Sequence, residues 1–196
     1  MKIFLDCIPC FVRQALDSAR LATDDQKIQD KVLRDTLELL ADMDMTQTPP
    51  VIAQKIHKTI RKMTGDIDPY HQIKQRFNKL AMEIADDLED EIKAFADPLE
   101  AAVPLAIAAN IIDLGLESAI RESYVKNMLR ECLTEGFEKQ QIQEFKNAVN
   151  DAHRILYLTD NAGEIVFDRL LIQQLGTDKI TVAVRGSAII NDATTE

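Results

Sequence analysis

Residues 154–164 read Arg-Ile-Leu-Tyr-Leu-Thr-Asp-Asn-Ala-Gly-Glu, so an apolar segment ends in a carboxylate, a carboxamide and a glycine. The apolar part predicts a β-strand, and the helical pattern after it places Asp160 and Asn161 at a strand-to-helix turn. Open α/β sheets bind ligands at the carboxyl ends of their strands. The oxygen atoms of these two side chains are the hard ligands that Mg²⁺ and Mn²⁺ prefer. The stretch therefore predicts a metal site, with one alternative: an ordinary turn in which Asp160 or Asn161 caps the helix.

A second apolar segment, residues 179–186, reads Lys-Ile-Thr-Val-Ala-Val-Arg-Gly and predicts another buried strand. A short helix between the two segments makes a strand-helix-strand unit, in which the strands run parallel and their carboxyl ends share an edge. The Asn-Asp-Ala-Thr run at residues 191–194 therefore returns Asp192 to the edge at which Asp160 lies. Two converging carboxylates repel each other, and a divalent cation between them removes that repulsion. The arrangement thus favours a metal ion bound at Asp160 and Asp192.

The pattern of the whole chain indicates the α/β class, with helices and strands segregated by region (α+β by region). Residues 1–152 read as an all-helical domain, in which proline follows Thr48, Asp68 and Asp97 as it does at helix N-caps. Residues 153–196 read as the first strand-helix-strand part of a Rossmann-like three-layer α/β domain. Two strands and one helix do not complete such a sheet. We therefore expect this domain to be truncated, with its remainder in a longer polypeptide or in a separate chain.

Charge and hydropathy exclude several kinds of partner. The net charge of the 196 residues is −10, and no block of lysine and arginine stands clear of acidic neighbours. This argues against a nucleic-acid partner. The longest uncharged apolar run, residues 101–112, is too short to span a bilayer, and residues 1–5 are too short for a signal peptide. We expect a cytoplasmic protein without a membrane partner. The oligomeric state is not predicted by the sequence.

Taken together, these motifs make the sequence resemble the metal-dependent damage-control phosphatases, catalogued as domain-of-unknown-function family 89 and ARMT1-like. The resemblance extends over nearly the whole chain, in separate motifs that occur in the expected order. An N-terminal Cys-x-x-Cys, formed by Cys7 and Cys10, is typical of the stand-alone branch of archaea and bacteria. One difference is Ala109, where the family usually has glycine. The matching residues are 6–11, 13–15, 68–70, 74, 97–99, 109–113, 160–164, 167–168, 185–186 and 190–194.

The resemblance implies hydrolysis of a small phosphorylated metabolite, with a divalent metal such as Mg²⁺, Mn²⁺, Co²⁺ or Ni²⁺ as cofactor. It implies that Asp160, Asn161 and Asp192 are the metal ligands. Glu164, at the start of the next helix, is a candidate to hold a metal-bound water or to contact the substrate. The first N–H groups of that helix, at residues 162–164, are expected to stabilise charge on a phosphate.

Four further residues are candidates for binding the substrate. Arg185, at a strand end, can hold a phosphate through two parallel hydrogen bonds. Lys74 is a second candidate cation, although a lysine on an amphipathic helix is more often a surface residue. Asn110 and Asp113 lie one helical turn apart and so share a face, either at the cleft or in a polar turn that ends a helix.

Two other functions stay open at this point. In the first, the turn at Asp160 binds a phosphometabolite or a nucleotide without hydrolysing it, although no P-loop or Gly-x-Gly-x-x-Gly motif is present. In the second, the chain is a helical interaction protein whose Cys7 and Cys10 bind zinc. The same cysteine pair can also be a redox pair or two packed thiols, and a structural zinc site normally needs four ligands.

Overall fold

The computed structural model describes residues 2–110, 122–135 and 137–195. Its residues form two compact units. The first unit consists of Met1–Gln72 and Ala188–Ile190, and the second consists of Ile73–Ser187 and Asn191–Glu196. The sequence predicts a domain boundary at residue 153, where the helical region ends and the strands begin. The compact units instead divide within the helical region.

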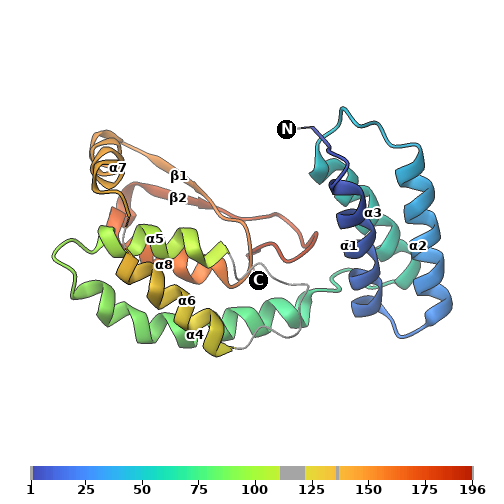
Figure 1. The fold of residues 1–196 in the computed structure, drawn as a ribbon, viewed down its shortest axis with the longest axis horizontal. Coiled ribbons are helices and arrows are strands. Elements are labelled where there is room, and N and C mark those ends of the chain that lie inside the picture. Colours follow the sequence, from blue (N-terminus) through green and yellow to red (C-terminus); the bar gives the residue numbers. More distant parts are fainter. Residues whose placement is uncertain (1, 111–121, 136, 196) are drawn as a thin grey trace. The chain divides into compact units, whose positions relative to one another are not determined.

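The first unit contains three helices, α1 (Cys7–Ala22), α2 (Gln26–Ala41) and α3 (Pro49–Thr64), and α1 packs against both of the others (Figure 1). Ile52, Ile56 and Ile60 recur at every fourth position of α3, so they form one buried stripe. Removing each of these side chains from water contributes about 1.5–3 kcal/mol to folding. The core of the first unit therefore follows directly from the helical period of the sequence.

Proline marks helix starts less accurately than the sequence pattern predicts. Thr48 is the N-cap of α3, as predicted. The N-caps predicted at Asp68 and Asp97 are wrong, because the next helices begin later, at His71 and Leu99. In both places the chain first closes a turn. The backbone carbonyl of Asp68 accepts a hydrogen bond from the His71 N–H at 3.1 Å, and the Asp97 carboxylate accepts one from the Leu99 N–H at 3.2 Å.

The second unit is built on helices that surround one apolar core. In chain order, its helices are α4 (His71–Lys93), α5 (Leu99–Ala109), α6 (Glu122–Glu135), α7 (Lys139–Asp151), α8 (Glu164–Leu175) and the short 3₁₀ helix η2 (Thr177–Lys179). The apolar helix α5 packs against α6, α7 and α8. Leu88, Leu105, Leu129 and Phe167 are fully buried where these helices meet. None of the described helices is long and apolar enough to cross a membrane.

Two parallel strands complete the second unit, β1 (Ile155–Leu158) and β2 (Ile180–Ala183), and they lie side by side in Figure 1. Because α8 connects them, the predicted strand-helix-strand unit is confirmed. Both strands were expected to be buried, but only one face is, since Tyr157 packs on the helical core while Leu156 and Leu158 on the other face are 64% and 71% exposed. This contrast follows from the alternation of side chains along a strand. The predicted α/β class, with helices before strands, is confirmed.

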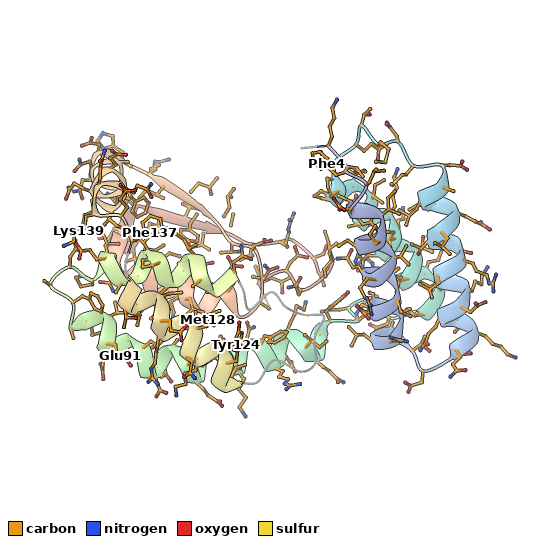
Figure 2. The ribbon with its side chains drawn as sticks, viewed as in Figure 1. Phe4, Glu91, Tyr124, Met128, Phe137 and Lys139 are labelled. Carbon is orange, nitrogen blue, oxygen red and sulfur yellow. The ribbon has the colours of Figure 1, made fainter. Side chains whose placement is uncertain are left out.

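Polar contacts tie the outer helices of the second unit together. On the outer side of α4, Glu91 accepts a hydrogen bond at 3.2 Å from Arg130 of α6, and Figure 2 labels Glu91 there. Exposed ion pairs of this kind contribute about 0.2–1 kcal/mol. The ammonium group of Lys179 donates to the carbonyls of Val149 and Ala152 at the end of α7. Lys179 thereby satisfies carbonyls that a helix C-terminus leaves without a partner.

Candidate active site

The turn that follows β1 is hydrogen-bonded to a segment far along the chain. The Ala162 N–H donates to the Asn191 carbonyl and the Ala193 N–H donates to the Asp160 carbonyl, both at 2.8 Å. Between these two bonds, Asn161 forms an isolated antiparallel bridge with Asp192. The structure thus brings Asp160, Asn161 and Asp192 together at the carboxyl edge of the sheet, as the sequence predicts.

Hydrogen bonds continue the strand pairing from the sheet to this turn. The backbone N–H and the hydroxyl of Thr159 both donate to the Ala183 carbonyl at 3.1 Å. Farther along, the Arg185 N–H donates to the Ala193 carbonyl at 3.0 Å. Backbone hydrogen bonds on both sides of positions 160, 161 and 192 therefore hold these residues next to each other.

The orientation of the Asn161 side chain is set by Glu164. Its amide nitrogen Nδ2 donates to Oε2 of Glu164 at 3.1 Å, and the side chain is only 5% exposed. With the nitrogen used in this way, Oδ1 is the end of the amide that can bind a cation. The N-cap of α8 is Gly163, without a hydrogen bond from a side chain of its own turn. The alternative in which Asp160 or Asn161 caps the helix is therefore wrong.

The helix N-terminus offers fewer N–H groups to a ligand than the sequence predicts. The Ala162 N–H is bonded to the Asn191 carbonyl, and the Gly163 N–H is bonded to Oδ1 of Asn78 at 2.7 Å. Of the three N–H groups expected to face a phosphate, at most that of Glu164 is left. The expectation fails because backbone and side-chain acceptors from other parts of the fold reach this turn first.

Asn78 is a residue of this site that the sequence does not reveal. It lies on α4, 85 positions before Gly163, among polar residues that resemble any exposed helix face. Lys74 lies one turn earlier on the same helix, so it shares a face with Asn78. Lys74 is only 8% exposed. Burial separates Lys74 from an ordinary surface lysine, and its predicted contact with a phosphate stays a prediction.

Three carboxylates, those of Asp160, Glu164 and Asp168, belong to the turn and to the helix that follows it. Glu164 follows the turn directly, and burial raises its pKa, with the charges of Asp168 and Asp160 adding to this effect and the hydrogen bond from Asn161 opposing it. Burial also raises the pKa of Asp168, which is 4% exposed. Asp192 adds a fourth carboxylate at this edge, where Arg185 pairs with it.

A tyrosine stabilises the most deeply buried of these carboxylates. The Tyr157 hydroxyl donates to Oδ1 of Asp168 at 2.6 Å, which lowers the pKa of Asp168 against the effect of burial. Burial and the neighbouring carboxylate raise the pKa of Tyr157, so its hydroxyl keeps its proton. Neither residue was among the sequence candidates for binding metal or substrate.

The other predicted substrate-binding residues have different settings. Arg185 donates from Nε to Oδ1 of Asp192 at 2.9 Å, and its side chain is 53% exposed. Asn110 is the C-cap of α5, with an exposed side chain. Asp113 lies outside the described residues. The substrate-binding roles of all three stay predictions.

The cysteine pair receives no support as a metal site. Cys7 is half-buried, Cys10 is exposed, and both are free thiols at the start of α1. In the part of the chain that the structure describes, no group of three or more His, Cys, Asp or Glu side chains could hold a metal ion. The candidate set of Asp160, Asn161 and Asp192 is not such a group, because only two of its members are carboxylates and the third is an amide.

A helical region joined to a parallel strand-helix-strand edge, with carboxylate and amide side chains at the strand ends, defines an α/β protein with polar groups gathered at the carboxyl edge of its sheet. The chain matches the family model of the Damage-control phosphatase ARMT1-like domain over residues 3–196. It therefore belongs to that family, and the predicted class of damage-control phosphatases is confirmed. Members of this family are generally metal-dependent.

Relatives in three archaea resemble the chain over its full length. It is 32% identical over 204 residues to an uncharacterized protein of Methanocaldococcus jannaschii, covering 100% of this chain and 66% of that protein. It is 31% identical over 202 residues to damage-control phosphatases of Archaeoglobus fulgidus and Pyrococcus horikoshii, of which it covers 69% and 68%. A crystal structure of a DUF89 family protein from P. horikoshii superposes with a TM-score of 0.84 at 28% identity, covering 99% of this chain and 68% of that one. The chain thus spans about two thirds of the length of these relatives.

Proposed function

We propose that this chain carries the metal site of a phosphatase that hydrolyses a small phosphorylated metabolite. The observation that carries the proposal is the bridge between Asn161 and Asp192, with hydrogen bonds on either side of it. It holds two residues 31 positions apart next to each other, together with Asp160. Membership of the damage-control phosphatase family supports the reaction class.

The ligands in this proposal are Asp160, Asn161 and Asp192. All three offer oxygen atoms, which suit Mg²⁺, Mn²⁺, Co²⁺ or Ni²⁺ in six-coordinate geometry. The hydrogen bond from Asn161 to Glu164 uses the amide nitrogen, so the amide oxygen is the atom left to act as a ligand. When bound, such a cation polarises a phosphoryl oxygen and lowers the pKa of a coordinated water.

The other residues of the site are assigned to the water and to the substrate. Glu164, whose carboxylate accepts the hydrogen bond from Asn161, is assigned to hold a metal-bound water or to contact the substrate. Arg185 is already oriented by Asp192, and its guanidinium group offers further N–H donors to a phosphate. Lys74 adds a second positive charge from α4.

The test is hydrolysis of p-nitrophenyl phosphate by the wild-type chain with Mg²⁺, Mn²⁺, Co²⁺ or Ni²⁺ added in turn. We expect turnover that depends on the metal and that falls at least about a hundredfold in Asp160→Ala and Asp192→Ala, since removing a ligand removes the Lewis acid. Asp178→Ala serves as the matched control, because Asp178 is an exposed carboxylate on η2.

Two results would contradict the proposal. Full turnover in Asp192→Ala, with a thermal unfolding curve like that of the wild type, would show that Asp192 is not a metal ligand. Binding of Mn²⁺ that depends on Asp160, without hydrolysis of any phosphate ester by the chain, would instead favour the module that binds a phosphometabolite without hydrolysing it.

A further inference from the structure

The N–H group of Gly163 receives its acceptor from a distant helix. Gly163 is the N-cap of α8, and the N–H of an N-cap residue is often taken by a glutamate or glutamine at the third helical position. In α8 that position is Val166, which has no side-chain acceptor, and the Asn161 side chain is bonded to Glu164. Oδ1 of Asn78, on α4, accepts the Gly163 N–H at 2.7 Å.

The chemistry of this bond determines how the Asn78 amide is oriented. A backbone N–H can only donate, so the atom of Asn78 that faces it must be the oxygen. Among the described residues, the Gly163 N–H is the hydrogen-bond partner of the Asn78 side chain. A neutral amide also accepts the bond without adding a further negative charge beside Asp160, Glu164 and Asp192. An asparagine therefore suits this position better than an aspartate when no cation is bound.

The backbone angles of Gly163, φ 85° and ψ −53°, correspond to a three-residue turn. Glycine adopts a positive φ at little cost, but many other conformations are equally open to it. Hydrogen bonds from other parts of the fold therefore select this conformation. Two hydrogen bonds hold this turn: the Asn191 carbonyl takes the Ala162 N–H, and Asn78 takes the N–H of the next residue.

We infer that Asn78 is a positioning residue of the candidate site. By holding the Gly163 N–H, it sets the direction in which Asp160 and Asn161 leave the turn. Its effect on metal binding rests on the proposed function, whereas its effect on the turn does not. Groups that orient metal ligands from outside typically change metal affinity 10- to 100-fold when they are removed.

Two substitutions separate the hydrogen bond from the shape of the side chain. Asn78→Leu keeps a side chain of similar size without an acceptor, and Asn78→Asp keeps an acceptor at the same place. The control is Asn127→Leu, which replaces an exposed asparagine on α6. For each protein we would measure hydrogen exchange of the Gly163 amide by NMR and Mn²⁺ affinity by titration calorimetry.

The expected pattern is a rescue by aspartate. Asn78→Leu should speed exchange of the Gly163 amide at least about tenfold and weaken Mn²⁺ binding about 10- to 100-fold. Asn78→Asp should restore slow exchange and bind Mn²⁺ at least as tightly as the wild type, because the added charge favours a cation. Asn127→Leu should match the wild type in both measurements.

Two outcomes would contradict the inference, and a third would contradict the proposed metal site. Unchanged Gly163 exchange in Asn78→Leu would overturn the inference, and so would faster exchange with unchanged Mn²⁺ affinity, since the bond would then serve folding alone. A wild type that binds no Mn²⁺ would refute the proposed metal site. In that case, faster Gly163 exchange in Asn78→Leu, reversed in Asn78→Asp, would still establish that Asn78 positions the turn.

Discussion

At the scale of single residues, the pair of Tyr157 and Asp168 shows how a buried carboxylate is kept in the second unit. Burial raises the pKa of Asp168 above its ordinary value, so between those two values the folded protein binds more protons than the unfolded chain. The free energy of unfolding therefore falls as pH rises through the pKa of folded Asp168. At neutral pH the ionised carboxylate costs stability, and the hydrogen bond from Tyr157 lowers that cost.

The substitution Tyr157→Phe tests this account. It removes the donor, raises the pKa of Asp168 further, and leaves a buried charge with one partner fewer. We expect the free energy of unfolding to fall by about 1–3 kcal/mol at pH 7 and by less at about pH 3, which lies below the ordinary aspartate pKa of 3.8, so that Asp168 is protonated. Urea unfolding at the two pH values measures this. Tyr124→Phe, at a residue that is 59% exposed, should change the free energy of unfolding by less than about 0.5 kcal/mol. An equal loss at both pH values would show that the ionised form of Asp168 is not what Tyr157 stabilises.

At the scale of an element, the junction of β1 and α8 combines a regular strand, a turn with a positive φ at Gly163 and a helix without a side-chain cap. The glycine at its centre is required by the backbone angles. L-residues with a Cβ atom rarely adopt a φ of 85°, whereas glycine does so at little cost. The turn therefore depends on Gly163 for its shape and on Asn78 and Asn191 for its support.

We expect Gly163→Ala to lower the free energy of unfolding by about 1–3 kcal/mol, because alanine is strained at this φ. The matched control is Gly186→Ala, since Gly186 has no positive φ and a Cβ atom there would meet open space. Its stability should stay within about 0.5 kcal/mol of the wild type. Thermal unfolding of both variants gives the comparison. Equal stability of Gly163→Ala and the wild type would mean that the turn adopts another conformation in solution.

At the scale of the whole molecule, the candidate ligands Asp160, Asn161 and Asp192 all belong to the second compact unit, whereas α1 to α3 belong to the first. A ligand that binds the folded form stabilises the part of the chain that must open to release it. Metal binding should therefore affect the two units differently.

Hydrogen exchange followed by mass spectrometry tests this expectation. With free Mn²⁺ at about a hundred times its dissociation constant, exchange through openings that release the metal should slow by up to about a hundredfold, which corresponds to about 2.7 kcal/mol. We expect this slowing in β1 and α8, and unchanged exchange in α1 to α3. Asp160→Ala should abolish the difference. Slowing confined to α1 would instead indicate that the metal binds at Cys7 and Cys10.

Local patterns in the sequence determined the strand-helix-strand unit, its parallel strands and the convergence of Asp160 with Asp192. They suffice because β-branched runs, glycine stops and the connection between neighbouring elements are properties of short segments. The tertiary structure alone decided which acceptors take the N–H groups of the turn and where the helical region divides into compact units. Asn78 looks like any polar residue of an amphipathic helix, and only the packing of α4 beside the turn brings its oxygen to Gly163. Contacts across 85 residues depend on how whole elements pack, and no local pattern of side chains encodes that.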